Sequence, residues 1–239
     1  MTGRATTVPK RHDGVVEAIR LLHNTRRLAV KARAEAMTSL RSMIVTAPEP
    51  LRSHLRVLSR AVLITTCAQL RPDSGHTDRT VHATKTALRS TARRIRTLSE
   101  EIGALDTDLD TLTRSAAPQL RARPGIGAET AAQLLITVGD NPHRISSEAA
   151  LANLCGVAPL LASSGTTNRH RLNRGGDRQA NRALHTILIH RLRTDPRTQA
   201  YRTRRAAEQK TPREIHRCLK RAIAREVYQL LVKNQPCPL

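Results

Sequence analysis

The chain has 239 residues, and its 41 lysines and arginines against 19 acidic residues leave a formal net charge of +22. Because so large a surplus repels itself, we expect a polyanionic partner, and nucleic acid rather than a membrane or an acidic protein. No apolar run reaches membrane-spanning length, and four separated cysteines without a CxxC pair argue against a zinc site and fit a cytoplasmic, nucleoid-associated protein.

The N-terminal part is predicted to be helical. Residues 1–12 are short, polar and basic, which is typical of a disordered tail. The stretch 13–46 has no proline and no glycine after Gly14, which predicts one long helix, and Ala47-Pro-Glu-Pro ends that helix. A second helix is expected over residues 51–70.

A heptad pattern follows these helices. Apolar residues recur at steps of three, four and seven at Leu88, Ile95, Leu98, Ile102, Leu105, Leu109 and Leu112. This seam is typical of a helical coiled-coil region, to which we assign residues 13–113. Such a helix packs either within its own domain or against a second copy, and the pattern is compatible with both.

Residues 114–239 are predicted to form a compact helical domain. Turn signals rich in glycine and proline recur in its first half, and two stronger helices are expected at about 177–194 and 212–233. Since no run of alternating β-branched residues indicates a strand, the predicted fold class is mostly α.

The stretch from Leu120 to Leu135 resembles a helix-hairpin-helix element. Pro124 ends the first helix, and Gly125 and Gly127 are expected to form a tight turn that larger residues would obstruct. The amides that begin the next helix would then be available to a DNA phosphate. An ordinary helical turn is the alternative interpretation.

A loop with two serines supplies the candidate chemistry. Ser163 and Ser164 precede Gly165, and the basic side chains that follow are Arg169, His170, Arg171 and Arg174. A serine becomes a nucleophile when a base takes its proton and cations stabilise the developing charge, for which histidine and arginine are suited. The alternative is a phosphate-binding loop whose serines only donate hydrogen bonds.

The two last helices each combine an apolar face with a basic one. In the first, Arg178, Arg182 and His185 follow steps of four and three, and the last carries Arg213, Arg217, Lys220 and Arg221. Contact with a nucleic-acid backbone is the function that these faces favour. The chain has two tyrosines, no phenylalanine and no tryptophan, which disfavours recognition of single strands by stacking.

Five motifs together resemble one family. They are Arg123-Pro-Gly-Ile-Gly, Cys155-Gly-Val-Ala-Pro, Ser163-Ser-Gly, the run from Arg169 to Leu184, and Arg217-Cys-Leu-Lys-Arg. Over residues 118–232 the chain is similar to the C-terminal region of insertion-sequence-110 family transposases, which are related to the Piv and MooV DNA invertases. Residues 13–113 more loosely resemble the helical coiled-coil segment of that family.

The resemblance implies DNA transposition by site-specific recombination, with a structured guide RNA as partner. In that family a serine beside a glycine attacks the DNA phosphodiester and becomes covalently linked to it. The match places this role on Ser164, with Ser163 as the neighbouring alternative. Family members also carry an N-terminal RuvC-like domain, in which four acidic residues bind Mg²⁺.

This sequence departs from the family at its N-terminus, where no strand-rich domain is found. Asp106, Asp108 and Asp110 do not share one helix face, so no metal ligand and no cofactor is assigned to this chain. Mg²⁺ is expected only with a RuvC-like domain supplied in trans, and a homo-oligomer is the other expected assembly. We expect a truncated copy or half of a split gene that is inactive alone, and the alternative function is that of an inactive remnant that only binds DNA or RNA.

Overall fold

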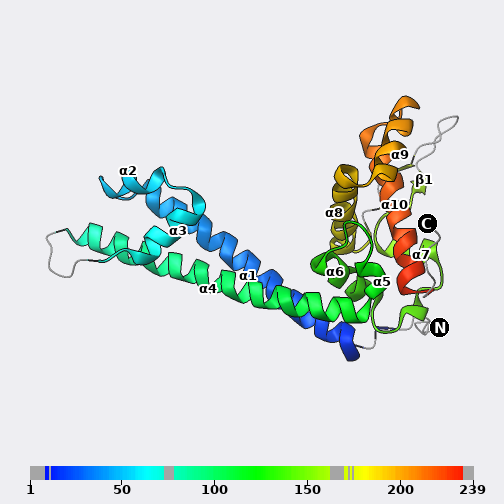
Figure 1. Cartoon of the computed structure of the whole chain (residues 1–239), viewed down its shortest axis with the longest axis horizontal. Coiled ribbons are helices and arrows are strands. Elements are labelled where there is room, and N and C mark those ends of the chain that lie inside the picture. The colour runs from blue at the N-terminus through cyan, green and yellow to red at the C-terminus, as the bar shows by residue number, and fades with distance from the viewer. Residues whose placement is uncertain are drawn as a thin grey trace, which may run out of the picture. The chain divides into compact units, whose positions relative to one another are not determined.

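A computed structural model describes residues 9–10, 12–72, 78–161, 170–171, 173 and 175–233. The helices are α1 (Gly14–Val45), α2 (Leu51–Arg56), α3 (Arg60–Gln69), α4 (Arg79–Ala116), α5 (Pro118–Arg121), α6 (Ala128–Val138), the 3-10 helix η1 (Pro142–Arg144), α7 (Glu148–Leu154), α8 (Arg178–Thr194), α9 (Pro196–Ala207) and α10 (Pro212–Leu231) (Figure 1). Two short strands, β1 (Leu160–Leu161) and β2 (His170–Arg171), pair antiparallel. The predicted mostly-α fold class is confirmed.

The chain divides into two compact units, which are described separately. Residues 24–107 form the hairpin unit, and residues 1–23 with 108–239 form the major unit. Most of the expected tail over residues 1–12 lies outside the described residues. Pro9 and Lys10 are described, and the Pro9 carbonyl accepts a hydrogen bond of 2.8 Å from the Asn141 amide.

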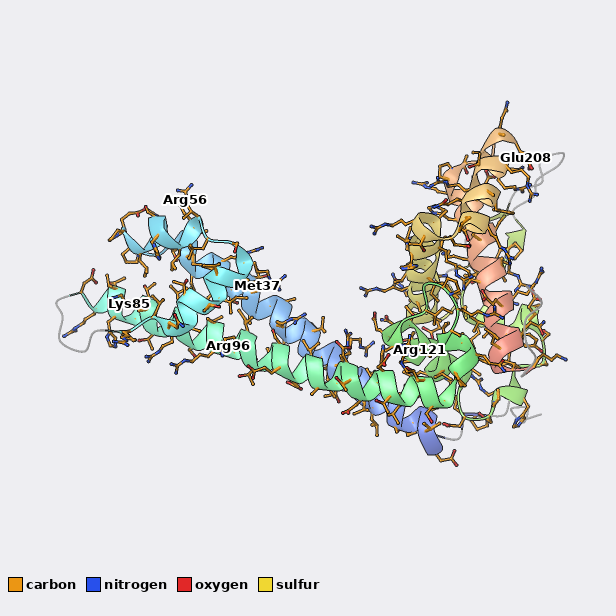
Figure 2. All side chains as sticks on the ribbon, viewed as in Figure 1. Met37, Arg56, Lys85, Arg96, Arg121 and Glu208 are labelled. Atoms are coloured by element: carbon orange, nitrogen blue, oxygen red, sulfur yellow. The ribbon has the colours of Figure 1, made fainter. Side chains whose placement is uncertain are left out.

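In the hairpin unit, helices α1 and α4 share one apolar core with α2 and α3. The core residues include Met37 (Figure 2), Leu40 and Ile44 of α1, Leu55, Leu63 and Cys67 of α2 and α3, and Leu88, Ala92 and Ile95 of α4. An ion pair between Arg26 and Asp106 also joins α1 to α4. The seam residues Leu88 and Ile95 are therefore covered by the same chain, which at these positions favours packing within a domain over pairing of two copies.

The single helix expected over residues 51–70 is wrong, because the structure has two helices there. Helix α2 ends at Arg56, and α3 begins at Arg60 after Ser59, whose backbone is extended at φ −62° and ψ 157°. Serine is more favourable at the residue before a helix than inside a helix, because inside the helix its hydroxyl competes with the backbone hydrogen bonds. Neither proline nor glycine marks this break in the sequence.

In the major unit, helix α8 packs against α6, α9 and α10 (Figure 1). Its side chains Leu184, Ile187 and Leu188 are fully buried. Burial of a side chain of this size stabilises a fold by about 1.5–3 kcal/mol, so this face accounts for the position of α8. Helices α8 and α10 confirm the two helices predicted near the C-terminus.

A close approach of two glycines joins the N-terminal side of α8 to the turn after α7. Gly156 has a positive φ of 65°, and its amide lies against Gly176. A Cβ on Gly176 would come within 2.9 Å of the Asn153 carbonyl oxygen and closer still to the backbone of Gly156. Only a residue without a side chain fits there, so the two backbone segments that flank β1 and β2 are held together.

We expect Gly176→Ala to lower the free energy of unfolding by about 1–3 kcal/mol, because the added methyl group must push the Gly156 backbone away. Urea unfolding followed by circular dichroism measures this change. Gly175→Ala is the matched control, since a Cβ there comes no nearer than 3.5 Å to the Asn173 side chain. Equal stability of the two variants would contradict the close approach.

Candidate nucleic-acid interface

The serine loop itself falls largely outside the described residues. These exclude residues 162–169, 172 and 174, so the roles expected of Ser163, Ser164, Arg169 and Arg174 stay predictions. For His170 and Arg171 the backbone is described, and it forms strand β2 opposite β1. Leu161 pairs with His170 and Leu160 with Arg171, so the two ends of the loop lie side by side.

A side-chain network fixes the chain just before β1. The amide nitrogen of Asn181 on α8 donates to the carbonyl oxygens of Cys155 at 3.0 Å and Gly156 at 3.1 Å. The oxygen of the same amide accepts a hydrogen bond of 2.9 Å from the Lys220 ammonium on α10. One side chain thus connects the turn after α7, helix α8 and helix α10.

Asp177 fixes the other side of the loop, where α8 begins. One carboxylate oxygen accepts hydrogen bonds from the amides of Gln179 and Ala180, and the other accepts one from the Thr137 hydroxyl at 2.9 Å. The Asp177 amide donates to the Leu154 carbonyl at 2.6 Å. A carboxylate at this position satisfies the free amides of the helix and is favoured by its dipole, so the first turn of α8 is well supported.

Beside the chain segments that flank the serine loop lies a pocket of about 830 Å³, between α9, α10 and residues 156–159. Its charged lining is one-sided, with seven cations at Arg197, Arg205, Lys210, Arg217, Lys220, Arg221 and Arg225. The acidic side chain in the lining is Glu214, which is already used at the start of α10, where it accepts a hydrogen bond of 2.9 Å from the Thr211 amide. The pocket is therefore a region of concentrated positive charge.

Some of these cations pair with carboxylates and others keep their charge available. Glu148 binds Arg221 at 2.7 Å and Arg225 at 2.9 Å. Among the described residues, Arg197 and Lys210 have no carboxylate within ion-pair distance. Lys220 contacts a neutral amide, and burial, together with the nearby Arg217, lowers the pKa of its ammonium group. A bound phosphate would stabilise the charged form of the Lys220 ammonium group, because it would place a negative charge beside it.

Helix α8 presents the basic face that its sequence predicted. Arg178, Arg182 and His185 are exposed, whereas Leu184 and Leu188 are buried. Neither arginine has an ion-pair partner among the residues that the structure describes. The His185 ring lies 6.2 Å from that of His216, and partial desolvation, followed by the charges of Lys220 and His216, lowers the pKa of His185. The positive charge that continues from the pocket onto α8 is therefore that of Arg178 and Arg182.

The glycine turn before α6 differs in part from the prediction. Gly125 has a φ of 78°, and a Cβ there would lie 3.2 Å from the Ile187 carbonyl oxygen and from a His190 ring nitrogen, so glycine is needed. For Gly127 the expectation of obstruction is wrong, since its backbone is extended and nothing lies within 4 Å of the position that a Cβ would take. Gly127 is exposed and precedes α6, whose first turn carries Glu129.

Arginines hold this turn against the rest of the major unit. The Arg121 guanidinium (Figure 2) donates to the Ile126 carbonyl at 2.6 Å and pairs with Asp110. From α8, Arg191 donates to the Pro124 carbonyl at 2.9 Å and pairs with Glu226 of α10 at 2.7 Å. The turn is rigidly placed, and a helix-hairpin-helix role in DNA binding stays a prediction.

Sequence reasoning missed α9, which supplies one wall of the pocket. The signal was present, because Asp195 followed by Pro196 is a strong helix start. In the structure the Asp195 side chain accepts a hydrogen bond of 3.0 Å from the Thr198 amide. Helix α9 then places Arg197, Tyr201 and Arg205 in the pocket lining.

No metal centre is found in the part of the chain that the structure describes. No group of three or more histidine, cysteine, aspartate or glutamate side chains there could hold an ion. Asp106 pairs with Arg26, and Asp110 pairs with Arg114 at 2.7 Å. None of the described helices has the length and apolar character needed to cross a lipid bilayer.

Comparison with known proteins agrees with the motifs around this site. Residues 117–203 match the family described as transposase IS116/IS110/IS902. Over 125 residues the chain is 35% identical to the "Insertion element IS110 uncharacterized 43.6 kDa protein" of Streptomyces coelicolor. The alignment covers 51% of this chain and 31% of that protein, so the chain spans about a third of the relative that it matches. The region that contains the serine loop and α8 is therefore similar to transposases of the IS116/IS110/IS902 family.

Proposed function

We propose that the chain acts in DNA transposition and site-specific recombination, as a part of an IS110-family transposase that binds DNA and attacks a phosphodiester with a serine. The observation that carries this proposal is the basic pocket beside the base of the serine loop. Both ends of the loop are anchored, through Asn181 on one side and Asp177 on the other. A loop anchored in this way can hold a nucleophile against a bound phosphate.

In the proposed reaction, the Ser164 hydroxyl oxygen attacks phosphorus and forms an O–P bond. The bond from phosphorus to one deoxyribose oxygen breaks, and that oxygen leaves with the electron pair and takes up a proton. His170 is the candidate for moving the serine proton, and the arginines at positions 169, 171 and 174 are candidates for holding the phosphate oxygens. The protein is left with a phosphoserine ester, from which a second strand can later displace the serine.

The described residues offer no cluster that suits Mg²⁺, so no step of this chain is assigned to a metal. We propose that divalent metal, a structured guide RNA and a RuvC-like domain are supplied by partners in the full recombination complex. Arg178 and Arg182 on α8, together with the amides at the start of α6, are proposed to contact the DNA backbone. A homo-oligomer is proposed as the state that brings two DNA ends together.

The nucleophile is tested by trapping the covalent intermediate. The chain is mixed with a RuvC-like partner, guide RNA and end-labelled DNA, and the labelled protein is separated under denaturing conditions. We expect a protein–DNA adduct that Ser164→Ala abolishes and Ser163→Ala retains, because only one hydroxyl is placed for attack. An adduct that persists in Ser164→Ala would refute the assignment, and loss in Ser163→Ala alone would move it to Ser163.

The backbone contact is tested by a salt titration of duplex binding. Six phosphate contacts correspond to a slope of about −5 in a plot of log affinity against log salt concentration. We expect the double variant Arg178→Gln/Arg182→Gln to make this slope shallower by about 2, because two contacts are removed. Arg52→Gln is the control, since Arg52 pairs with Glu49 at 2.6 Å in the hairpin unit. A slope that the α8 variant leaves unchanged would contradict contact through this face.

A further inference from the structure

The volume of the pocket between α9 and α10 suits a ligand much smaller than a DNA duplex. Its 830 Å³ lies within the size range of pockets that enclose small molecules. A duplex carries its phosphates on a convex outer surface, with the bases stacked inside. Such a surface can contact the rim of the pocket, whereas the interior is open to a nucleotide that is free of a partner strand.

The lining of the pocket combines positively charged side chains with apolar ones. Cations come from α9 and α10, and apolar side chains come from Val157, Ala158, Pro159, Leu219 and Ala222. A site for phosphate alone needs only the cations. A nucleotide has a charged phosphate and a flat, weakly polar base, and this lining offers a surface to each.

One aromatic ring adds to the apolar part of the lining. Of the two tyrosines, Tyr228 is 4% exposed and belongs to the core, whereas Tyr201 lines the pocket. The guanidinium carbons of Arg204 and Arg205 lie 5.4 Å and 5.9 Å from the centre of the Tyr201 ring. Burial, followed by the neighbouring Cys218 thiol, raises the pKa of the Tyr201 hydroxyl, so the ring stays neutral. An aromatic ring can stack on a base, and nearby arginines add an attraction for the base and its phosphate.

We propose that this pocket binds an unpaired nucleotide of a nucleic-acid strand, with its base against Tyr201 and its phosphate on the cations of α9 and α10. The inference rests on the proposed function in that the strand belongs to the nucleic acid of the recombination complex. The low aromatic content of the chain disfavours a long stacking platform, but a single ring is enough for one base. DNA and RNA share this chemistry, so both are tested.

The first experiment measures the affinity of the full chain for a labelled DNA strand, the RNA strand of the same sequence and the matching DNA duplex. Tyr201→Leu is expected to weaken strand binding by about fivefold or more and to change duplex binding by less than about twofold. Tyr201→Phe, which keeps a ring, is expected to restore the affinity for the strand. Circular dichroism checks that both variants are folded.

A second pair of variants separates the pocket from charge in general. Arg197 lines the pocket and Arg202 does not, although both are exposed arginines of α9. Arg197→Gln is expected to weaken strand binding more than Arg202→Gln, because each removes one charge and only the first removes it from the site. Equal effects of the two variants, or equal losses of strand and duplex binding in Tyr201→Leu, would overturn the proposal.

Cys218 gives a direct report on whether the pocket is occupied. It lines the pocket and is exposed, whereas Cys67 and Cys155 are buried. In a Cys237→Ser background, the unpaired strand is expected to slow maleimide labelling of Cys218, and the duplex is expected to leave it unchanged. Strand binding without this protection would overturn the pocket proposal, while the Ser164 adduct and the salt dependence of duplex binding would still stand as separate tests of the proposed function. Of the DNA strand and the RNA strand, the one that protects Cys218 from maleimide at the lower concentration is identified as the preferred ligand.

Discussion

The contact between the backbones of Gly156 and Gly176 is the constraint on which the site depends. These residues precede and follow the β1–β2 pair, and their separation leaves no room for a Cβ on Gly176. Asn181 reinforces the contact by binding the carbonyls of Cys155 and Gly156. Gly156 lies a few residues before β1 and Gly176 a few residues after β2. Their contact therefore helps to place both ends of the serine loop relative to α8 and α10.

The distribution of charge follows from how few carboxylates the chain has. Glu148 and Glu226 each serve two arginines and join elements that are distant in the sequence. Glu214 and Asp177 are used to begin α10 and α8. While these four acidic side chains serve structural roles, cations of the major unit such as Arg197, Arg178 and Arg182 are exposed to solvent. An anionic partner can therefore bind them without displacing an internal ion pair.

Under the proposed function, the pocket and the basic face of α8 would bind different parts of a nucleic acid. The exposed face of a helix can follow a phosphate backbone from outside, and a pocket can accept a single residue that leaves the stack. Lys220 connects the pocket with the serine loop, because it lines the pocket and its ammonium group donates a hydrogen bond to Asn181, which holds the chain before β1. A ligand that binds Lys220 would thus change the hydrogen bond between Lys220 and Asn181, the side chain that holds the chain before β1.

The sequence by itself determined the elements whose signals are local. Apolar periodicity, runs without proline or glycine and flanking turn residues predicted α1, α8 and α10, because such patterns depend on neighbours only a few positions apart. It did not predict the break at Ser59, where no proline or glycine stands, or the free space at Gly127. Only the tertiary structure decided that Gly156 meets Gly176 and that Arg197, Tyr201 and Lys220 surround one pocket, because these contacts join segments whose meeting depends on the burial of the apolar faces of α8 and α10.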